Sequence, residues 1–195
     1  MSRFIQLASL AALLASSAPL TAQAPLQSRT SGFTAGASVN GSSLSGWGES
    51  SPDAGGGFGV RAGYGLSRLQ LFAALDFGVM AGGKLGTDYG IGHGEAGARY
   101  SFRSDSRALR PYVQATVLRL VTLEGEDTDE MTSSGAGYSA GAGVEYFLRR
   151  SIAVDLGVSR TRGSITVTEN HAGARGDLDA GYATTRVTLG LNWHP

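Results

Sequence analysis

The chain has 195 residues, a formal net charge of zero and no cysteine. This length fits one domain, the balanced charge gives no strong attraction to nucleic acid, and the lack of cysteine excludes disulfides and thiolate metal sites. Glycine is abundant, with 30 residues. So much glycine weakens ordinary strands, unless backbones and bulky neighbours must fit inside a narrow space.

The first residues have the pattern of an export signal. Arg3 supplies the positive start, and a short apolar core and a small-residue region follow it. The apolar core is far shorter than the ~20 residues that a membrane-spanning helix needs. We therefore predict a signal peptide over residues 1–24, with cleavage after Ala22 or Ala24, and a short periplasmic lead at 25–31.

Beyond this point, apolar residues alternate with small or polar ones in eight segments. In the first segment, for instance, Phe33 and Val39 alternate with Thr34 and Asn40. A period of two places the two sets on opposite faces of a strand. The predicted strands span residues 32–41, 57–65, 69–81, 92–102, 112–123, 135–148, 152–159 and 182–193. The faces of the fifth strand are poorly contrasted because Arg119 falls on its apolar side, so the register of this strand is open.

Strands of roughly ten residues are long enough to cross a membrane when tilted. The predicted connections alternate between long ones, at 42–56, 82–91, 124–134 and 160–181, and short ones, at 66–68, 103–111 and 149–151. Long loops on one side and short turns on the other are typical of outer-membrane barrels. We therefore predict an all-β fold, an eight-stranded antiparallel up-and-down transmembrane β-barrel over residues 32–195, in the outer membrane of a Gram-negative-type cell envelope.

Aromatic residues gather near the predicted strand ends. Amphipathic rings prefer the two membrane–water interfaces, where they form belts one bilayer apart. The predicted belt on the short-turn side consists of Phe33, Tyr64, Phe102, Tyr112, Tyr146 and Trp193, and the belt on the long-loop side of Phe77, Tyr89, Tyr138 and Tyr182. A soluble lipocalin-like barrel is the alternative, but it would scatter its aromatic residues and turn its apolar face inward.

The face opposite the lipid carries charge. The predicted lumen charge network consists of Arg61, Asp76, Glu95, Arg99, Glu145, Asp155 and Arg186. The interior of an eight-stranded barrel is just wide enough for side chains, and buried charges are tolerated when they are paired. A selective pore would show a ring of one sign, whereas these signs are mixed. We interpret the network as a salt-bridged plug, with an ion pathway as the alternative.

The hairpin around the turn at 149–151 gives a sharper expectation. If Leu148 pairs with Ile152, Glu145 stands directly opposite Asp155 inside the barrel. Like charges that face each other across two strands are destabilising, so a cation must lie between them or one of them must hold a proton. Arg186 on the adjacent strand and Arg99 across the lumen are the two candidate cations.

Three short motifs carry a resemblance to a known family. They are Arg-Pro-Tyr-Val-Gln-Ala at 110–115, Gly-Ala-Gly-Val-Glu-Tyr at 141–146 and Thr-Leu-Gly-Leu-Asn-Trp at 188–193. With them the mature chain resembles the small eight-stranded outer-membrane proteins of the OmpA-like and OmpX-like kind. The resemblance implies a monomeric barrel whose outer loops act in envelope integrity, adhesion or host interaction. Outer-membrane lipids, lipopolysaccharide and the outer-membrane assembly machinery are the partners it implies, with a surface ligand left open.

Two patterns could carry chemistry. The glycines at 92–97 have the spacing of a dinucleotide loop but lack its flanking strand and helix. Within them, His93 and Glu95 could suggest acid–base chemistry like that of the lipid A deacylases, but no His-x-Ser pair exists and no nucleophile and base are evident. The acidic run at 124–130 could hold Ca²⁺ but does not match a Ca²⁺-loop motif. We predict no catalytic residue, cofactor or metal, with a deacylase-like enzyme or a small low-conductance porin as the alternative.

Overall fold

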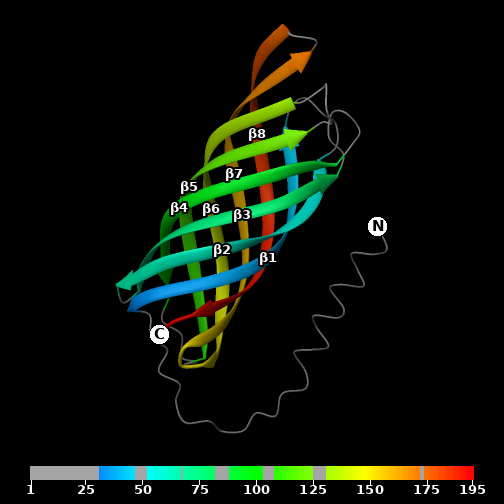
Figure 1. Cartoon of the computed structure of the whole chain (residues 1–195). Coiled ribbons are helices and arrows are strands. Elements are labelled where there is room, and N and C mark those ends of the chain that lie inside the picture. Colours follow the sequence, from blue (N-terminus) through cyan, green and yellow to red (C-terminus); the bar gives the residue numbers. More distant parts are fainter. Residues whose placement is uncertain are drawn as a thin grey trace.

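The protein is described from a computed structural model (Figure 1). The structure describes residues 31–46, 52–66, 68–81, 88–102, 108–124, 131–171 and 174–195, without the side chains at 123–132 and 167–178. The predicted signal peptide lies outside these residues and stays a prediction. Among the described residues, no helix is long and apolar enough to cross a membrane.

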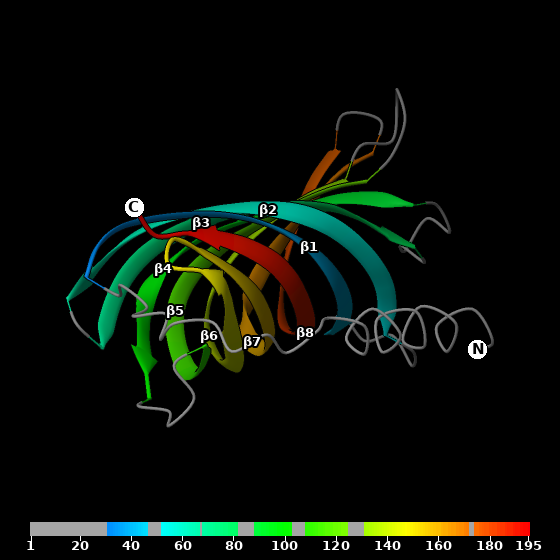
Figure 2. The same cartoon turned by 90° about the horizontal axis from the view of Figure 1, so that it is seen from below.

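The strands form one closed antiparallel barrel. Each strand pairs with its neighbour in the sequence, and β8 returns to pair with β1. The strands are β1 (Gly32–Gly46), β2 (Asp53–Leu66), β3 (Leu69–Ala81), β4 (Tyr89–Ser101), β5 (Leu109–Glu124), β6 (Met131–Arg149), β7 (Ile152–His171) and β8 (Ala174–Trp193). The predicted eight-stranded up-and-down barrel is confirmed, and Figures 1 and 2 show its wall from two directions.

The two ends of the barrel differ, and we name them by their connections. The turn end carries the connections β2–β3, β4–β5 and β6–β7 together with the C-terminus, and the loop end carries the other four connections. The hairpin of β7 and β8 projects farthest at the loop end (Figure 1, orange). These two strands stay paired up to His171 and Ala174.

The predicted long loop at 160–181 is therefore wrong, and so is the predicted loop at 124–134, because β6 begins at Met131. Both errors have one physical cause. The apolar alternation in a barrel strand exists only where lipid covers one face. Beyond the lipid this signal ends, while the backbone ladder continues because its hydrogen bonds do not depend on side chains.

The two faces of the wall are sharply separated. Val117 is 67% exposed and its neighbour Leu118 only 6%, which settles the open register of the fifth strand and places Arg119 on the outer face. In the hairpin of β6 and β7, Glu145 does face Asp155 as predicted. The expected pairing of Leu148 with Ile152 is wrong, because the register shifts near the turn and Arg149 pairs with Ile152.

Candidate functional site

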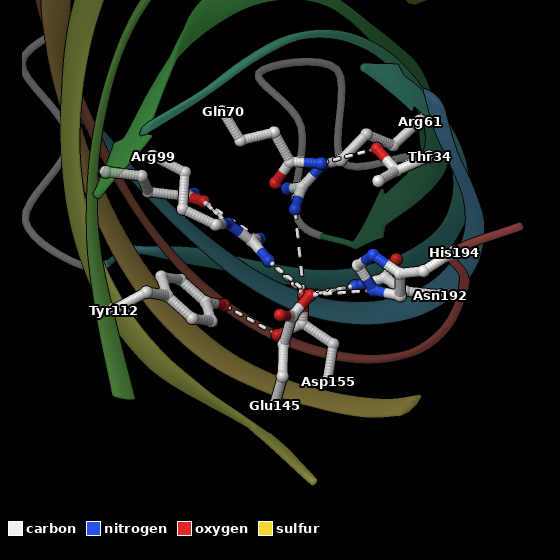
Figure 3. Close-up of polar contacts among 10 residues, drawn as sticks. Thr34, Arg61, Gln70, Arg99, Tyr112, Glu145, Asp155, Asn192 and His194 are labelled. Carbon is white, nitrogen blue, oxygen red and sulfur yellow. Dashed lines mark hydrogen bonds and ion pairs between the residues drawn. The ribbon is translucent and has the colours of Figure 1, made fainter. Parts of the chain in front are cut away.

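The lumen near the turn end contains a cluster of buried charges built on three strands. Glu145 on β6 and Asp155 on β7 face each other, and Arg99 on β4 reaches across the lumen to both. Nη1 of Arg99 lies 3.1 Å from Oε1 of Glu145 and 2.8 Å from Oδ2 of Asp155. Figure 3 shows the guanidinium pointing at the two carboxylates. Arg99 is thus the cation that lets the two like charges coexist.

Neutral side chains complete the hydrogen bonding of this cluster. The Tyr112 hydroxyl donates to Oδ1 of Asp155 at 2.6 Å, and Nδ2 of Asn192 donates to both carboxylates, at 2.7 and 3.0 Å. Nε and Nη2 of Arg99 donate to Oε1 of Gln114 at 3.3 and 3.1 Å. The same guanidinium stacks 3.7 Å from the centroid of the Tyr112 ring. Partners on several strands therefore fix the position of each charge.

Two further basic side chains border the cluster. Nη1 of Arg61 lies 3.6 Å from Oδ2 of Asp155, and its guanidinium sits 4.4 Å from the centroid of the Phe72 ring. Nε2 of His194 lies 3.7 Å from Oε1 of Glu145. Burial lowers the pKa of His194 below its ordinary value, which favours the neutral imidazole. Because Arg61 on β2 pairs with Asp155, we include it with Arg99, Glu145 and Asp155 and call these four residues the Arg99 cluster.

A second set of charges lies farther from the turn end. Arg186 on β8 bonds Glu95 on β4 through Nη2, and its Nη1 donates to Oδ2 of Asp76 on β3 at 3.0 Å. Asn40 donates to the other oxygen of Asp76 at 3.3 Å. We call Asp76, Glu95 and Arg186 the Arg186 cluster. Of the two candidate cations, only Arg99 bonds the carboxylates of the hairpin, because Arg186 bonds Asp76 and Glu95 instead.

The two clusters leave little space between them. A cavity of about 30 Å³ lies where they meet, with Asp76, Asp155 and Arg186 in its lining. A buried water needs a cavity of roughly 10–15 Å³, so this one holds a few water molecules at most. All seven predicted lumen charges therefore point inward, and the structure divides them into two clusters instead of one.

The lumen near the loop end contains a layer of packed apolar side chains. Met80 and Leu120 have no exposed surface, and Ile165 is 1% exposed. The full set, which we call the apolar layer, consists of Leu44, Met80, Tyr89, Ile91, Leu118, Leu120, Ile165 and Tyr182. The sequence places several of these residues on inward positions, but nothing in their spacing showed that they pack against one another across the barrel.

Three residues were wrongly predicted to belong to the aromatic belts. Tyr89, Tyr112 and Tyr182 are 2–4% exposed and point into the lumen, so they do not contact lipid. The other seven belt positions lie on the outer face and are 45–64% exposed: Phe33, Tyr64, Phe77, Phe102, Tyr138, Tyr146 and Trp193.

Paired glycines make room for two of the inward tyrosines. Gly143 and Gly157 are partners across β6 and β7, and a Cβ atom on either would stand 2.4 or 2.6 Å from the Tyr112 hydroxyl. Gly137 and Gly163 form a second pair, and a Cβ on either would lie 2.8 or 2.6 Å from Tyr182. The glycine-rich inner faces were the sequence signal for bulky neighbours. The position of each tyrosine in the period-two alternation places it on the inner face, and this would have identified the two tyrosines as those neighbours.

The remaining sequence patterns supply no chemical site among the described residues. His93 is 7% exposed inside the lumen, and Glu95 is held by Arg186. No group of three or more potential metal-ligating side chains occurs in the described part of the chain. The acidic run at 124–130 lies outside the described side chains.

Comparisons with known proteins agree with this architecture. A family model described as outer membrane protein beta-barrel domain matches residues 8–194. No curated protein matches the chain. Among solved structures, Neisserial surface protein A has a TM-score of 0.65 at 17% identity, covering 84% of this chain and 97% of its own. OprG from Pseudomonas aeruginosa has a TM-score of 0.62 at 12% identity, covering 86% and 98%.

A third solved structure is the attachment invasion locus protein Ail of Yersinia pestis, with a TM-score of 0.53 at 11% identity, covering 83% of this chain and 99% of its own. At such identities, these likenesses establish the fold alone.

Proposed function

The chain belongs to the family of outer membrane protein beta-barrel domains, and from this premise we propose that it is a closed barrel acting structurally or through its outward surface, in adhesion or envelope interaction. It is located in the outer membrane of a Gram-negative-type envelope. One structurally similar protein is named for attachment and invasion, which supports a role at the cell surface. We assign no catalytic step to the described side chains, among which His93 and His194 both lie in the lumen.

The observation that carries this proposal is the filling of the lumen. Two ion clusters block its half nearer the turn end, with a cavity of about 30 Å³ between them. The apolar layer fills the half nearer the loop end. Among the described side chains, neither half offers a continuous path lined by one sign of charge, which selective pores use.

Planar-bilayer recording tests the closure. We expect the purified protein to give no stable conductance steps. The double variant Arg99→Ala, Asp155→Ala removes side chains that cross the lumen, so it should admit a small leak current. Arg149→Ala, at an exposed position of the turn, is the matched control and should stay silent. Large, stable steps from the unaltered protein would contradict the proposal.

Ligand binding tests the outward surface. If the function lies at the loop end, replacing residues 125–130 by a short Gly-Ser linker should abolish binding to the surface ligand. Lumen variants that still fold, such as Glu145→Gln, should bind normally. Loss of binding in the lumen variant alone would place the function inside the barrel instead.

A further inference from the structure

Three arginines lie on the outer face of β5 and β7, two strands apart, where lipid is expected. Arg119 on β5 and Arg160 and Arg162 on β7 are all exposed. Strand β6 runs between them, and Arg162 pairs with Tyr138 while Arg119 pairs with Ala136. The three arginines therefore flank one stretch of β6 on both sides. Strands two apart are separated by about 10 Å, a gap that two long arginine side chains can close from opposite sides.

The height of these arginines on the wall matches a membrane surface. Arg119 comes ten residues after Leu109, where β5 begins at the turn end. At about 3.4 Å per residue and a tilt near 45°, ten residues rise about 24 Å, which equals the ~25 Å apolar band of such barrels. On β7, which begins at Ile152, Arg162 also lies ten residues from the turn end, and Arg160 lies eight residues from it. The arginines thus lie at the boundary between acyl chains and headgroups.

Their charge is not neutralised by the described part of the protein. No ion pair among the described residues involves Arg119, Arg160 or Arg162. Their outward neighbours across the ladder are uncharged, as with Ala136 and Ala140 on β6. Three cations on one lipid-facing patch therefore call for anionic groups from the surroundings, and arginine matches phosphate oxygens well because it donates through a planar fork.

An apolar groove starts at Arg119. It has a volume of about 730 Å³, and its lining includes Ala62, Ala73, Leu75, Gly94, Ala96 and Val117. Across the ladder, Arg119 pairs with Gly94, Gly94 with Leu75, and Leu75 with Val60. Val60 lies six residues from the turn-end terminus of β2, whereas Arg119 lies ten residues from that of β5. The groove therefore descends from the headgroup boundary toward the middle of the bilayer.

We infer that this face binds one phosphorylated lipid of the outer leaflet, with its phosphates on Arg119, Arg160 and Arg162 and an acyl chain in the groove. This inference rests on the outer-membrane position in the proposed function and adds a site to it. The three arginines are complementary in charge to a phosphorylated headgroup. The apolar groove that begins beside Arg119 fits an acyl chain of the same lipid. A free phosphate would use the arginines alone and leave the groove empty.

The test uses the folded protein in phosphatidylcholine nanodiscs, titrated with bisphosphorylated lipid A while native mass spectrometry counts the bound lipid. The double variant Arg119→Gln, Arg162→Gln should bind about 30-fold more weakly, because each arginine near an anionic headgroup contributes about a fivefold gain in affinity. The matched control Arg149→Gln, Arg150→Gln removes two exposed arginines at the turn end and should bind like the unaltered protein. Equal affinity of the Arg119/Arg162 variant and the unaltered protein would overturn the inference.

Further arms separate the lipid from its parts. Dephosphorylated lipid A should bind at least tenfold more weakly, and equal binding would overturn the phosphate assignment. Gly94→Leu should weaken lipid A binding several-fold but leave competition by inorganic phosphate unchanged, since it only fills the groove. A Cβ at Gly94 meets nothing nearer than Leu75 Cδ2 at 3.7 Å, so the fold tolerates it. Ala142→Leu, on the outer face of β6, is its control, and equal effects of the two leucines would overturn the acyl-chain site.

Planar-bilayer conductance recorded on the same protein preparations keeps the two proposals distinguishable. A silent barrel without lipid A binding would refute the lipid site and leave the closed lumen standing. A conducting barrel that still binds lipid A through Arg119 and Arg162 would refute closure and leave the lipid site standing.

Discussion

The two halves of the lumen fill the same narrow space by opposite means. Near the turn end, Arg99 and Glu145 are 1–2% exposed and owe their positions to specific partners. Near the loop end, Met80 and Leu120 are equally buried and belong to the apolar layer. The polar half depends on every partner being present, because a buried charge without its counter-charge is strongly unfavourable. The apolar layer depends mainly on how well its side chains fill the space, so the stability lost on truncation is graded.

Removing Arg99 should produce the largest effect. Arg99→Met keeps much of the volume but leaves Glu145 and Asp155 enclosed without their main cation. Breaking a buried pair in this way costs about 3–5 kcal/mol, so we expect the free energy of unfolding to fall by that amount. Urea unfolding in lipid vesicles, followed by tryptophan fluorescence, measures it.

Rescue experiments show whether the two ion clusters are separate. Glu145→Gln should restore part of the stability lost in Arg99→Met, because it removes one of the stranded charges. It should not help Arg186→Met, for which Glu95→Gln is the matching rescue, since Arg186 bonds Glu95 and Asp76. If Glu145→Gln rescued both arginine variants equally, the division into two clusters would be wrong.

Truncation in the apolar layer should cost less. Leu120→Ala leaves a cavity at a fully buried position, and we expect a loss of about 3 kcal/mol in the same unfolding measurement. Val117→Ala is the control: it lies on the same strand but is 67% exposed toward lipid. Its loss should stay below about 1 kcal/mol, because lipid chains can refill the space. Equal losses at both positions would contradict the packed apolar layer.

The sequence predicted most of the wall because lipid imposes a strict period of two. Strand β3, whose outer positions are strongly apolar, was predicted with its observed bounds. Beyond the lipid the alternation disappears. The parts of β7 and β8 at the loop end were therefore predicted as a loop, although they remain paired. The backbone pairing of these strands thus extends farther than the apolar alternation from which strands are predicted.

The sequence predicted which charged residues face the lumen, but not which of them form ion pairs with one another. Period two alone places Asp76, Arg99 and Arg186 on the inner face, yet which acid each arginine meets depends on the tilt and stagger of the strands around the barrel. Tyr112 shows the same limit: its position near a strand end suggested an interfacial ring, whereas it lies over Gly143 and Gly157 and bonds Asp155.

The smallest predicted effect on stability compares Tyr112 and Tyr182, the two lumen tyrosines that each lie over a pair of glycines. Tyr112→Phe removes the hydroxyl that donates to Asp155 at 2.6 Å and should cost about 1.5 kcal/mol, the lower end for a hydrogen bond to a charged group. Tyr182, in the apolar layer, has a buried hydroxyl with no hydrogen-bond partner among the described residues. Tyr182→Phe should therefore leave the free energy of unfolding unchanged or raise it slightly, because a buried unsatisfied hydroxyl is itself unfavourable. A larger loss for Tyr182→Phe than for Tyr112→Phe would mean that the half near the loop end also relies on specific polar contacts, and the contrast between the two halves would fail.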